Sequence, residues 1–139
     1  MELPVKVFIE QVKRGNVLLK QHFHGIDHPK MFVVMDVSED TVTGFFFVNS
    51  KINTNVINKP AQIELQYPIK VADYSFLKHD SFICASSLQR ACVNDIAADF
   101  QSGEVRLVGK LLDADMAALL AKLNASKTYS AYIKRTFFS

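Results

Sequence analysis

Residues 31–48 read MFVVMDVSEDTVTGFFFV, and this stretch decides the fold. Two runs rich in β-branched and aromatic residues, 31–37 and 41–48, flank the short polar turn 38–40. Such a pair of runs predicts a β-hairpin. Both runs are almost continuously apolar, so neither has a polar face. We therefore expect strands that are buried on both sides, within a small barrel or under a helix.

Helical spacing is visible near both ends of the chain. A short N-terminal helix is predicted after Pro4, with Gly15 as its stop, by four apolar residues spaced three and four apart: Val5, Phe8, Ile9 and Val12. Asp113 is expected to cap a helix over 114–123, whose apolar face is Met116, Leu119, Leu120 and Leu123. Ser126 is expected to cap a second helix that carries Tyr129, Tyr132, Ile133 and Phe137.

Further strands are predicted around the hairpin. Polar and apolar residues alternate strictly over 62–67, which is typical of a half-exposed strand. Residues 68–71 continue it past a bulge, because proline cannot donate to a central ladder. Short strands are expected at 82–84 and 104–108, whereas 16–23 fits either a strand or an irregular segment.

The chain has the size and composition of one globular domain. It has 139 residues, of which 49% are hydrophobic and 22% charged, values typical of proteins that bury a core without disulfides or metals. No internal repeat, linker or low-complexity segment interrupts it. The sequence therefore predicts a single β-rich α+β domain over residues 1–139.

Targeting and membrane signals are not evident in the sequence. Residues 1–6, MELPVK, lack the charged start and apolar run of a secretory signal. The longest apolar stretches are far shorter than the roughly 20 residues that span a bilayer. Without an export signal, Cys84 and Cys92 are expected to be reduced thiols in or near the core. We expect a soluble cytoplasmic protein with no membrane partner.

Charge alone does not indicate a partner. The formal net charge of +2 is too small to indicate nucleic-acid binding by itself. No acid follows Asp115, whereas four cations do: Lys122, Lys127, Lys134 and Arg135. The simplest interpretation is a solvated helical surface with cations near helix C-termini, where the helix dipole favours them.

Histidines gather before the hairpin. His22, His24, Asp27 and His28 lie within seven residues, but their spacing fits no closed zinc pattern, so we expect no metal site. His28 is of more interest, because it precedes Pro29 at the entrance to the buried strand. A histidine there can transfer protons near neutral pH.

Two enzyme classes are not favoured. Residues 78–81, KHDS, place a base, an acid and a hydroxyl side by side. Catalytic triads assemble from distant segments, and no G-x-S-x-G motif is present, so we reject a hydrolase triad and expect Asp80 to form a turn. The five glycines are scattered singly, so no glycine-rich phosphate loop is indicated.

A polar cluster follows the second strand of the hairpin. Residues 49–51 read NSK, with Asn53 and Asn55 beyond them. One interpretation is that these side chains cap backbone groups after a buried strand. The other is that they supply amide, hydroxyl and cationic groups to a phosphodiester, together with His28 and Lys30 at the start of the neighbouring strand.

Residues 28–34 and 45–51, HPKMFVV and FFFVNSK, resemble the MazF/PemK family of toxin ribonucleases. The family pattern is a loop that ends in a basic residue and proline, a buried strand, a hairpin turn, and a second strand that ends in a polar Thr-Ser-like pair. Segments 62–67, 76–83 and 109–111 are also similar. The resemblance covers roughly residues 25–123.

The resemblance implies an SH3-like small β-barrel with appended helices, usually a homodimer. Such a protein cuts single-stranded RNA without metal or other cofactor and is neutralised by an antitoxin protein. The family's catalytic pair, an Arg before the Pro and a Thr after the second strand, matches His28 and Asn49 by position, or else Lys30 and Ser50. Neither pair has the family residues. His28 can replace Arg as an acid or cation, and Ser50 can replace Thr, whereas Asn49 has no hydroxyl.

Two classes of function follow. In the first, a 2′-hydroxyl attacks the adjacent phosphate while His28 or Lys30 and Ser50 stabilise charge and move protons. The residues expected to bind RNA are then Lys51, Asn53, Tyr74 and Lys78. In the second, the domain is a non-catalytic module that binds a protein partner or RNA. In both classes Tyr74 and its aromatic neighbours either stack on bases or, more simply, pack in the core.

Overall fold

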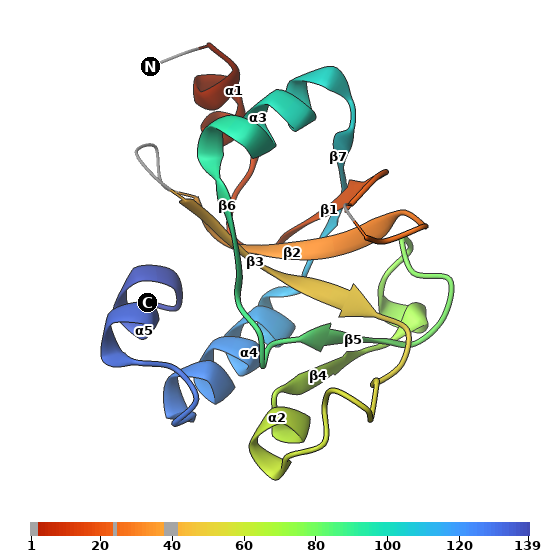
Figure 1. Cartoon of the computed structure of the whole chain (residues 1–139), viewed down its shortest axis with the longest axis vertical. Helices are drawn as coiled ribbons and strands as arrows, with labels where there is room; N and C mark the ends of the chain where they lie inside the picture. The colour runs from red at the N-terminus through yellow and green to blue at the C-terminus, as the bar shows by residue number, and fades with distance from the viewer. Residues whose placement is uncertain (1–2, 24, 38–41) are drawn as a thin grey trace.

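The computed structural model describes residues 3–23, 25–37 and 42–139, which form an α+β fold (Figure 1). Seven strands make one antiparallel sheet in the order β4-β5-β3-β2-β1-β7, and β6 pairs with β3 next to β5. The strands are β1 (Asn16–Lys20), β2 (Lys30–Val37), β3 (Val42–Asn49), β4 (Gln66–Ile69), β5 (Ser81–Cys84), β6 (Gln89–Cys92) and β7 (Val105–Lys110). The helices are α1 (Leu3–Gln11), α2 (Pro60–Glu64), α3 (Val93–Ser102), α4 (Asp113–Ala125) and α5 (Ala131–Phe137), with a 3₁₀ turn η1 (Val71–Asp73).

The predicted hairpin is confirmed as β2 and β3, the central strands of the sheet. Phe32 pairs with Phe47, and Val33 with Phe46, in antiparallel register. Successive residues point to opposite faces, so Phe32 joins one core cluster while Val33 and Phe46 join another. The strands are therefore buried on both sides, as expected. The turn 38–40 and Thr41 lie outside the described residues.

One face of the sheet packs against α1 and α3, which lie side by side at the top of Figure 1. Phe8 of α1 is fully buried, and its ring meets Phe100 of α3 edge to face with centroids 5.5 Å apart. The predicted N-terminal helix is confirmed. Strand β6 and helix α3 were not predicted; α3 buries Ile96 and Ala97 in the same cluster.

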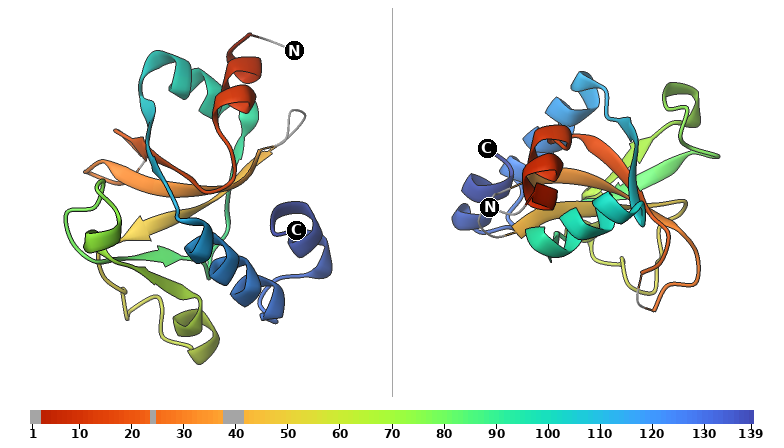
Figure 2. Two further views of the ribbon diagram at one scale, coloured as in Figure 1. Left: turned by 180° about the vertical axis from the view of Figure 1, so that it is seen from behind. Right: turned by 90° about the horizontal axis from the view of Figure 1, so that it is seen from above.

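The opposite face is covered by α4 and α5. Helix α4 lies behind the sheet in Figure 1 and in front of it when seen from behind (Figure 2). Leu119 and Leu123 of α4 are fully buried in the cluster that contains Phe46, which confirms the predicted apolar face. The ring of Phe137 rests on Gly44 of β3, where a Cβ would lie 2.5 Å from the ring. Glycine therefore allows α5 to approach the strand closely.

The sheet is open. Edge strands β4 and β7 do not pair with each other in the described part of the chain, so the expected closure into an SH3-like barrel is not seen there. Side chains bridge the gap instead. The hydroxyls of Tyr67 and Tyr74 both donate to the Asp115 carboxylate of α4, the first at 2.7 Å. The ring of Phe76 lies against Gly109 of β7.

This bridge makes stability sensitive to alkali. Burial and the hydrogen bond to Asp115 raise the pKa of Tyr67 to about 12, and the same two causes raise the pKa of Tyr74. In the unfolded chain a tyrosine titrates near 10. Between about pH 10 and 12 the unfolded chain has therefore lost a proton that the folded state keeps, so the free energy of unfolding falls as pH rises.

We expect thermal unfolding to move to lower temperature as pH rises through that window, and to move less in a Tyr67→Phe variant. The tyrosinate absorbance of Tyr67, taken as the difference between the two proteins, should appear near pH 12. An appearance at pH 10 in protein that is still folded would contradict the prediction.

The strand predicted at 62–67 is wrong for its first half, and it is confirmed only from Gln66, from where it continues to Ile69. The chain forms α2 over Pro60–Glu64, and β4 begins only at Gln66. Pro60 suits the first turn of a helix, and the Gln62 side-chain oxygen accepts from the backbone N–H of Lys59 at 3.1 Å. These local helix-start signals outweigh the alternation. Strand β4 itself is an edge strand, which tolerates the missing donor of its proline.

Two predicted helix caps are also corrected. Helix α4 begins at Asp113 rather than after it, so its carboxylate lies in the first turn, where the helix dipole favours an anion. Ser126 ends α4, its N–H donating to the Lys122 carbonyl at 3.0 Å. Ser130 caps α5 instead, because its hydroxyl accepts from the Ile133 N–H at 3.2 Å.

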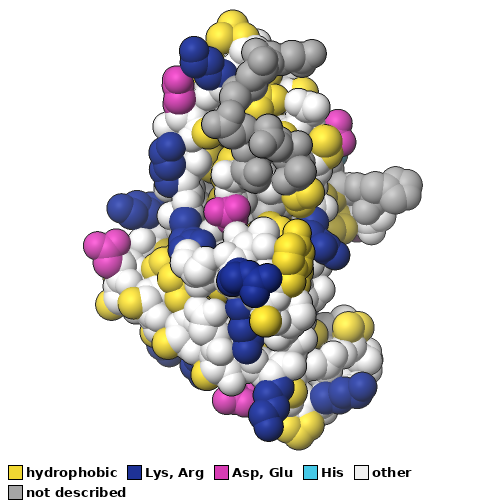
Figure 3. Space-filling view, turned by 90° about the vertical axis from the view of Figure 1, so that its left-hand side faces the viewer, with side chains coloured by type: hydrophobic (Ala, Val, Ile, Leu, Met, Phe, Trp, Pro, Cys, Tyr) yellow, Lys and Arg dark blue, Asp and Glu magenta, His cyan; other side chains and the backbone are white. Residues whose placement is uncertain are grey.

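The basic residues near the end of the sequence lie where the helix dipole favours cations. Lys122 is in the last turn of α4, and Lys134 and Arg135 are in the last turn of α5, which confirms the interpretation from the sequence for these three, whereas Lys127 lies between the two helices. On the face that carries α5, Lys and Arg side chains outnumber Asp and Glu (Figure 3).

Cys84 is a half-buried free thiol, as expected, whereas Cys92 is exposed, although it was expected in or near the core. Within the described ranges, no helix has the length and apolar character to traverse a bilayer.

Candidate functional site

Four neighbouring strands contribute polar side chains to one pocket. Lys30 is the first residue of β2, and Asn49 is the last residue of β3. Cys84 ends β5 and pairs with Gln66 at the start of β4. In the pairing of the strands these four residues share one face of the sheet, the face that α1 and α3 cover further along. They line the pocket beyond the helices, where that face is open.

Two loops form the walls of this pocket, which has a volume of about 820 Å³. One loop follows β3, and the other joins β5 to β6. The lining is His28, Lys30, Asn49, Ser50, Lys51, Ile52, Asn53, Thr54, Val56, Ile57, Gln66, Cys84, Ser87 and Gln89. It includes two lysines, a histidine and four amides, and none of the described residues in the lining is an acid. Such a lining suits an anionic ligand that also presents hydrogen-bonding groups.

Lys30 is the central cation of the pocket. Its ammonium donates to the side-chain oxygen of Asn49 and stands 5.6 Å from the centre of the Phe47 ring. Burial lowers the pKa of Lys30 below its ordinary value. The ammonium is therefore poorly solvated, and a bound anion would replace part of the missing water. The hydrogen bond also joins the start of β2 to the end of β3.

His28 lies on the rim of the pocket. Its Nδ1 is 3.0 Å from a carboxylate oxygen of Asp27, and 64% of its side chain is exposed. The bond to His28 also lowers the pKa of the Asp27 carboxyl. When Nδ1–H donates to this carboxylate, the neutral ring leaves Nε2 as an acceptor. That arrangement suits a group that takes a proton from a bound substrate.

Most of the residues predicted from the sequence meet in this pocket. All four expected catalytic residues line it: His28, Lys30, Asn49 and Ser50. Lys51 and Asn53, expected to bind RNA, also line it. Tyr74 does not, because it is only 4% exposed and its hydroxyl is held by Asp115 and the Leu112 N–H, which leaves no face for a base to stack on. Lys78 is exposed in the β4–β5 connection, outside the pocket lining.

Other lining residues were not predicted. Gln66 and Cys84 come from strands β4 and β5, and Ser87 and Gln89 come from the chain after β5. No local motif marks them. Their place follows from the pairing of β5 with β3, a contact between segments more than thirty residues apart. Only the correct order of the strands could have found them.

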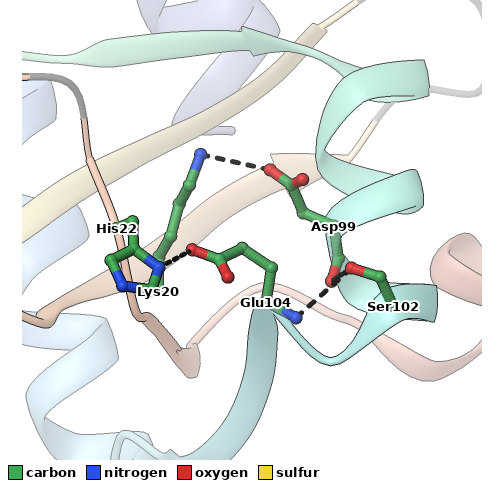
Figure 4. A network of polar contacts seen from close by, with 5 residues as sticks. All are labelled: Lys20, His22, Asp99, Ser102 and Glu104. Atoms are coloured by element: carbon green, nitrogen blue, oxygen red, sulfur yellow. Dashed lines mark hydrogen bonds and ion pairs between the residues drawn. The ribbon is translucent and has the colours of Figure 1, made fainter.

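The histidines before the hairpin have separate partners. His22 is bonded to Glu104 at 2.9 Å, beside the Lys20–Asp99 ion pair of 3.1 Å (Figure 4). His28 is bonded to Asp27. His24 lies outside the described residues. The side chains that are described therefore form two separate acid–base pairs.

Residues 78–80 lie in the β4–β5 connection, and Ser81 begins β5. The Asp80 carboxylate accepts from the Val71 N–H at 2.9 Å, at the start of η1, and Asp80 itself lies in irregular chain before β5 and not in the turn that was expected. The Ser81 hydroxyl donates to the His79 carbonyl at 3.0 Å. Neither group is arranged to activate the other.

A second hollow of about 660 Å³ lies between α2 and the end of α4. Its lining includes three alanines, Glu64, Lys122 and Lys127. It has no histidine and no side-chain amide. The pocket at the ends of β2 and β3 is therefore the stronger candidate for chemistry.

Comparison with protein-family models and with curated proteins finds no match for this chain. The pocket itself is therefore the basis for the function. Its chemistry has three parts: a poorly solvated lysine, a histidine paired with a carboxylate, and amides that are fixed by their partners.

Proposed function

We propose that this protein is a metal-independent endoribonuclease that cleaves single-stranded RNA in the pocket at the ends of β2 and β3. The observation that carries the proposal is the lining of the pocket. It combines His28, two lysines, the Ser50 hydroxyl and several amides, with no acid among the lining residues that the structure describes. RNA offers the matching chemistry, because each nucleotide has an anionic phosphate, a 2′-hydroxyl and a base with hydrogen-bonding edges.

The phosphate would bind at Lys30 and Lys51. Both lysines line the pocket, Lys30 half-buried and Lys51 exposed. An exposed lysine mainly attracts the RNA backbone, in a way that depends on salt. A half-buried lysine interacts more strongly, because less water screens its charge. Lys30 is therefore the group that stabilises the added negative charge on phosphorus during the reaction.

His28 would move the proton that starts the reaction. The 2′-hydroxyl loses its proton to Nε2 of the neutral imidazole, and the 2′-oxygen forms a bond to the adjacent phosphorus. The bond from phosphorus to the 5′-oxygen then breaks, and the leaving oxygen takes a proton from the imidazolium or from water. The products are a 2′,3′-cyclic phosphate and a 5′-hydroxyl. Ser50 donates a hydrogen bond to a phosphate oxygen. The positive charge of Lys30 stabilises the negative charge on the phosphate, a role that a metal ion has in other nucleases.

The test is an incubation of purified protein with an end-labelled single-stranded RNA in excess EDTA. We expect cleavage that leaves 2′,3′-cyclic phosphate ends. Lys30→Met should slow cleavage, whereas Lys6→Met, at an exposed position of α1, should not. RNA that stays intact under all conditions, or cleavage that EDTA abolishes, would refute the proposal.

A non-catalytic RNA-binding module is the second candidate. The observation that favours it is that β3 ends in Asn49, whose side-chain oxygen accepts a hydrogen bond from Lys30. This position therefore offers no hydroxyl. Binding of the labelled RNA without any cleavage would identify the protein as such a module. Binding of a protein partner alone would remove RNA from both candidates.

The family resemblance supports three further parts of the proposal. The open sheet, bridged between β4 and β7 by side chains, is a variant of the SH3-like barrel. The protein acts in the cytoplasm as a homodimer, and an antitoxin protein neutralises it. Sedimentation equilibrium tests for the homodimer. Co-expression with a small neighbouring gene that encodes an acidic protein tests for the antitoxin.

A further inference from the structure

Gln66 is a buried polar side chain at the floor of the pocket. The residue is 6% exposed. Its amide nitrogen donates two hydrogen bonds, one to the Gln62 carbonyl at 3.2 Å and one to the Ser86 hydroxyl at 2.8 Å. Both protons of the nitrogen are therefore used, and the orientation of the amide is fixed.

The Gln66 side-chain oxygen is left as an acceptor for a ligand. No donor in residues 3–23, 25–37 or 42–139 bonds it, and it is not among the fully enclosed polar atoms that lack a partner, so it keeps some contact with solvent at a residue that lines the pocket. In the Asn49 amide the oxygen is used and the nitrogen is left, which is the reverse of Gln66. The Asn49 oxygen accepts from Lys30, so its nitrogen is the group left to donate. The pocket thus presents a fixed donor at Asn49, which a carbonyl or ring-nitrogen acceptor of any base can use, and a fixed acceptor at Gln66, which only a base with an amino or imino proton can use.

We infer that the pocket selects an RNA base with an exocyclic amino group, cytosine or adenine, over a keto base such as uracil. The inference rests on the proposed function, because RNA must enter this pocket. Cytosine N4 and adenine N6 carry protons that the Gln66 oxygen can accept. Uracil places its O4 acceptor there instead, and two facing acceptors are both left without a proton. Gln66 cannot turn to correct this, since its nitrogen is held by Gln62 and Ser86.

Binding of four RNA decamers tests the inference. Each is labelled at its 5′ end and consists of uridines with one central variable base: uracil, cytosine, adenine or N4,N4-dimethylcytosine. Fluorescence anisotropy in EDTA with 2′-O-methyl RNA measures affinity without cleavage. We expect cytosine and adenine to bind about three- to tenfold more tightly than uracil, the effect of one hydrogen bond. Dimethylcytosine, which has lost its amino protons, should bind no better than uracil.

Two variants connect this preference to Gln66. Gln66→Met keeps the length of the side chain but removes the acceptor, so all four decamers should bind equally. Ser86→Ala keeps Gln66 but frees its amide to turn, so the preference should shrink even if Gln66→Met fails to fold. Gln101→Met, at an exposed position of α3, should leave the preference unchanged.

The outcomes separate this inference from the proposed function. Equal binding of all four decamers by the unaltered protein would overturn the inference and leave RNA binding in place. A preference that survives both Gln66→Met and Ser86→Ala would also overturn it. No binding of any decamer would overturn both the inference and the proposed function.

Discussion

Replacing His28 by alanine is expected to lower the rate of RNA cleavage by about 10²–10⁴-fold, the usual effect of removing a general acid or base. His28 brings an imidazole to the lining of the pocket, and imidazole is the most common general acid or base in enzymes. Its Nδ1 is held by Asp27, so its Nε2 is free to face the substrate. Single-turnover cleavage of an end-labelled RNA measures the effect, because it follows the chemical step rather than product release.

His22→Ala is the matched control. His22 is also an exposed histidine with Nδ1 bonded to a carboxylate, at 2.9 Å from Glu104, but it is not part of the pocket lining. This variant should cleave RNA at the normal rate. A similar loss in both variants would point to a general effect on folding or charge. Full activity in His28→Ala would refute the role of His28 and leave Lys30 and Ser50 to explain any cleavage.

The hairpin and its site residues could be predicted because their signals are local. The apolar runs that become β2 and β3 are close together in sequence, which favours their antiparallel pairing, and the register that results contains one shift between Val34 and Asp36. In that register the first residue of β2, Lys30, lies opposite the last residue of β3, Asn49. The pairing of strand ends that the sequence suggested therefore follows from the hairpin itself.

The rest of the pocket depends on contacts that no local pattern records. Gln66 and Cys84 reach the floor because β5 pairs with β3 and β4 pairs with β5. The sequence around Gln66 was also misleading, since its alternation favours a strand where Pro60 and Gln62 start a helix. Tyr74 shows the reverse case. Base stacking and core packing were both open for its aromatic ring, and the fold buries the ring in the core and bonds its hydroxyl to Asp115 and to the Leu112 N–H.

Phe46→Ala is expected to lower the free energy of unfolding by about 3–5 kcal/mol, the usual cost of removing a buried aromatic ring. Phe46 lies in the middle of β3 and is fully buried. Its ring stacks on Phe138 with centroids 5.9 Å apart and belongs to the cluster of Leu119 and Leu123. Alanine there leaves a cavity between the sheet and both C-terminal helices, which are too well packed to fill it. Urea denaturation followed by circular dichroism measures the change.

Tyr132→Ala provides the matched control, because it also removes an aromatic ring. Tyr132 lies on α5 but is 63% exposed, so its loss should change the free energy of unfolding by less than about 0.5 kcal/mol. A loss below about 1 kcal/mol for Phe46→Ala would contradict the close packing of β3 against α4 and α5.

Because β3 also ends in Asn49, a large loss of stability in Phe46→Ala should be accompanied by weaker RNA binding at temperatures near the unfolding transition. Well below that transition, RNA binding should be preserved, since Phe46 faces away from the pocket.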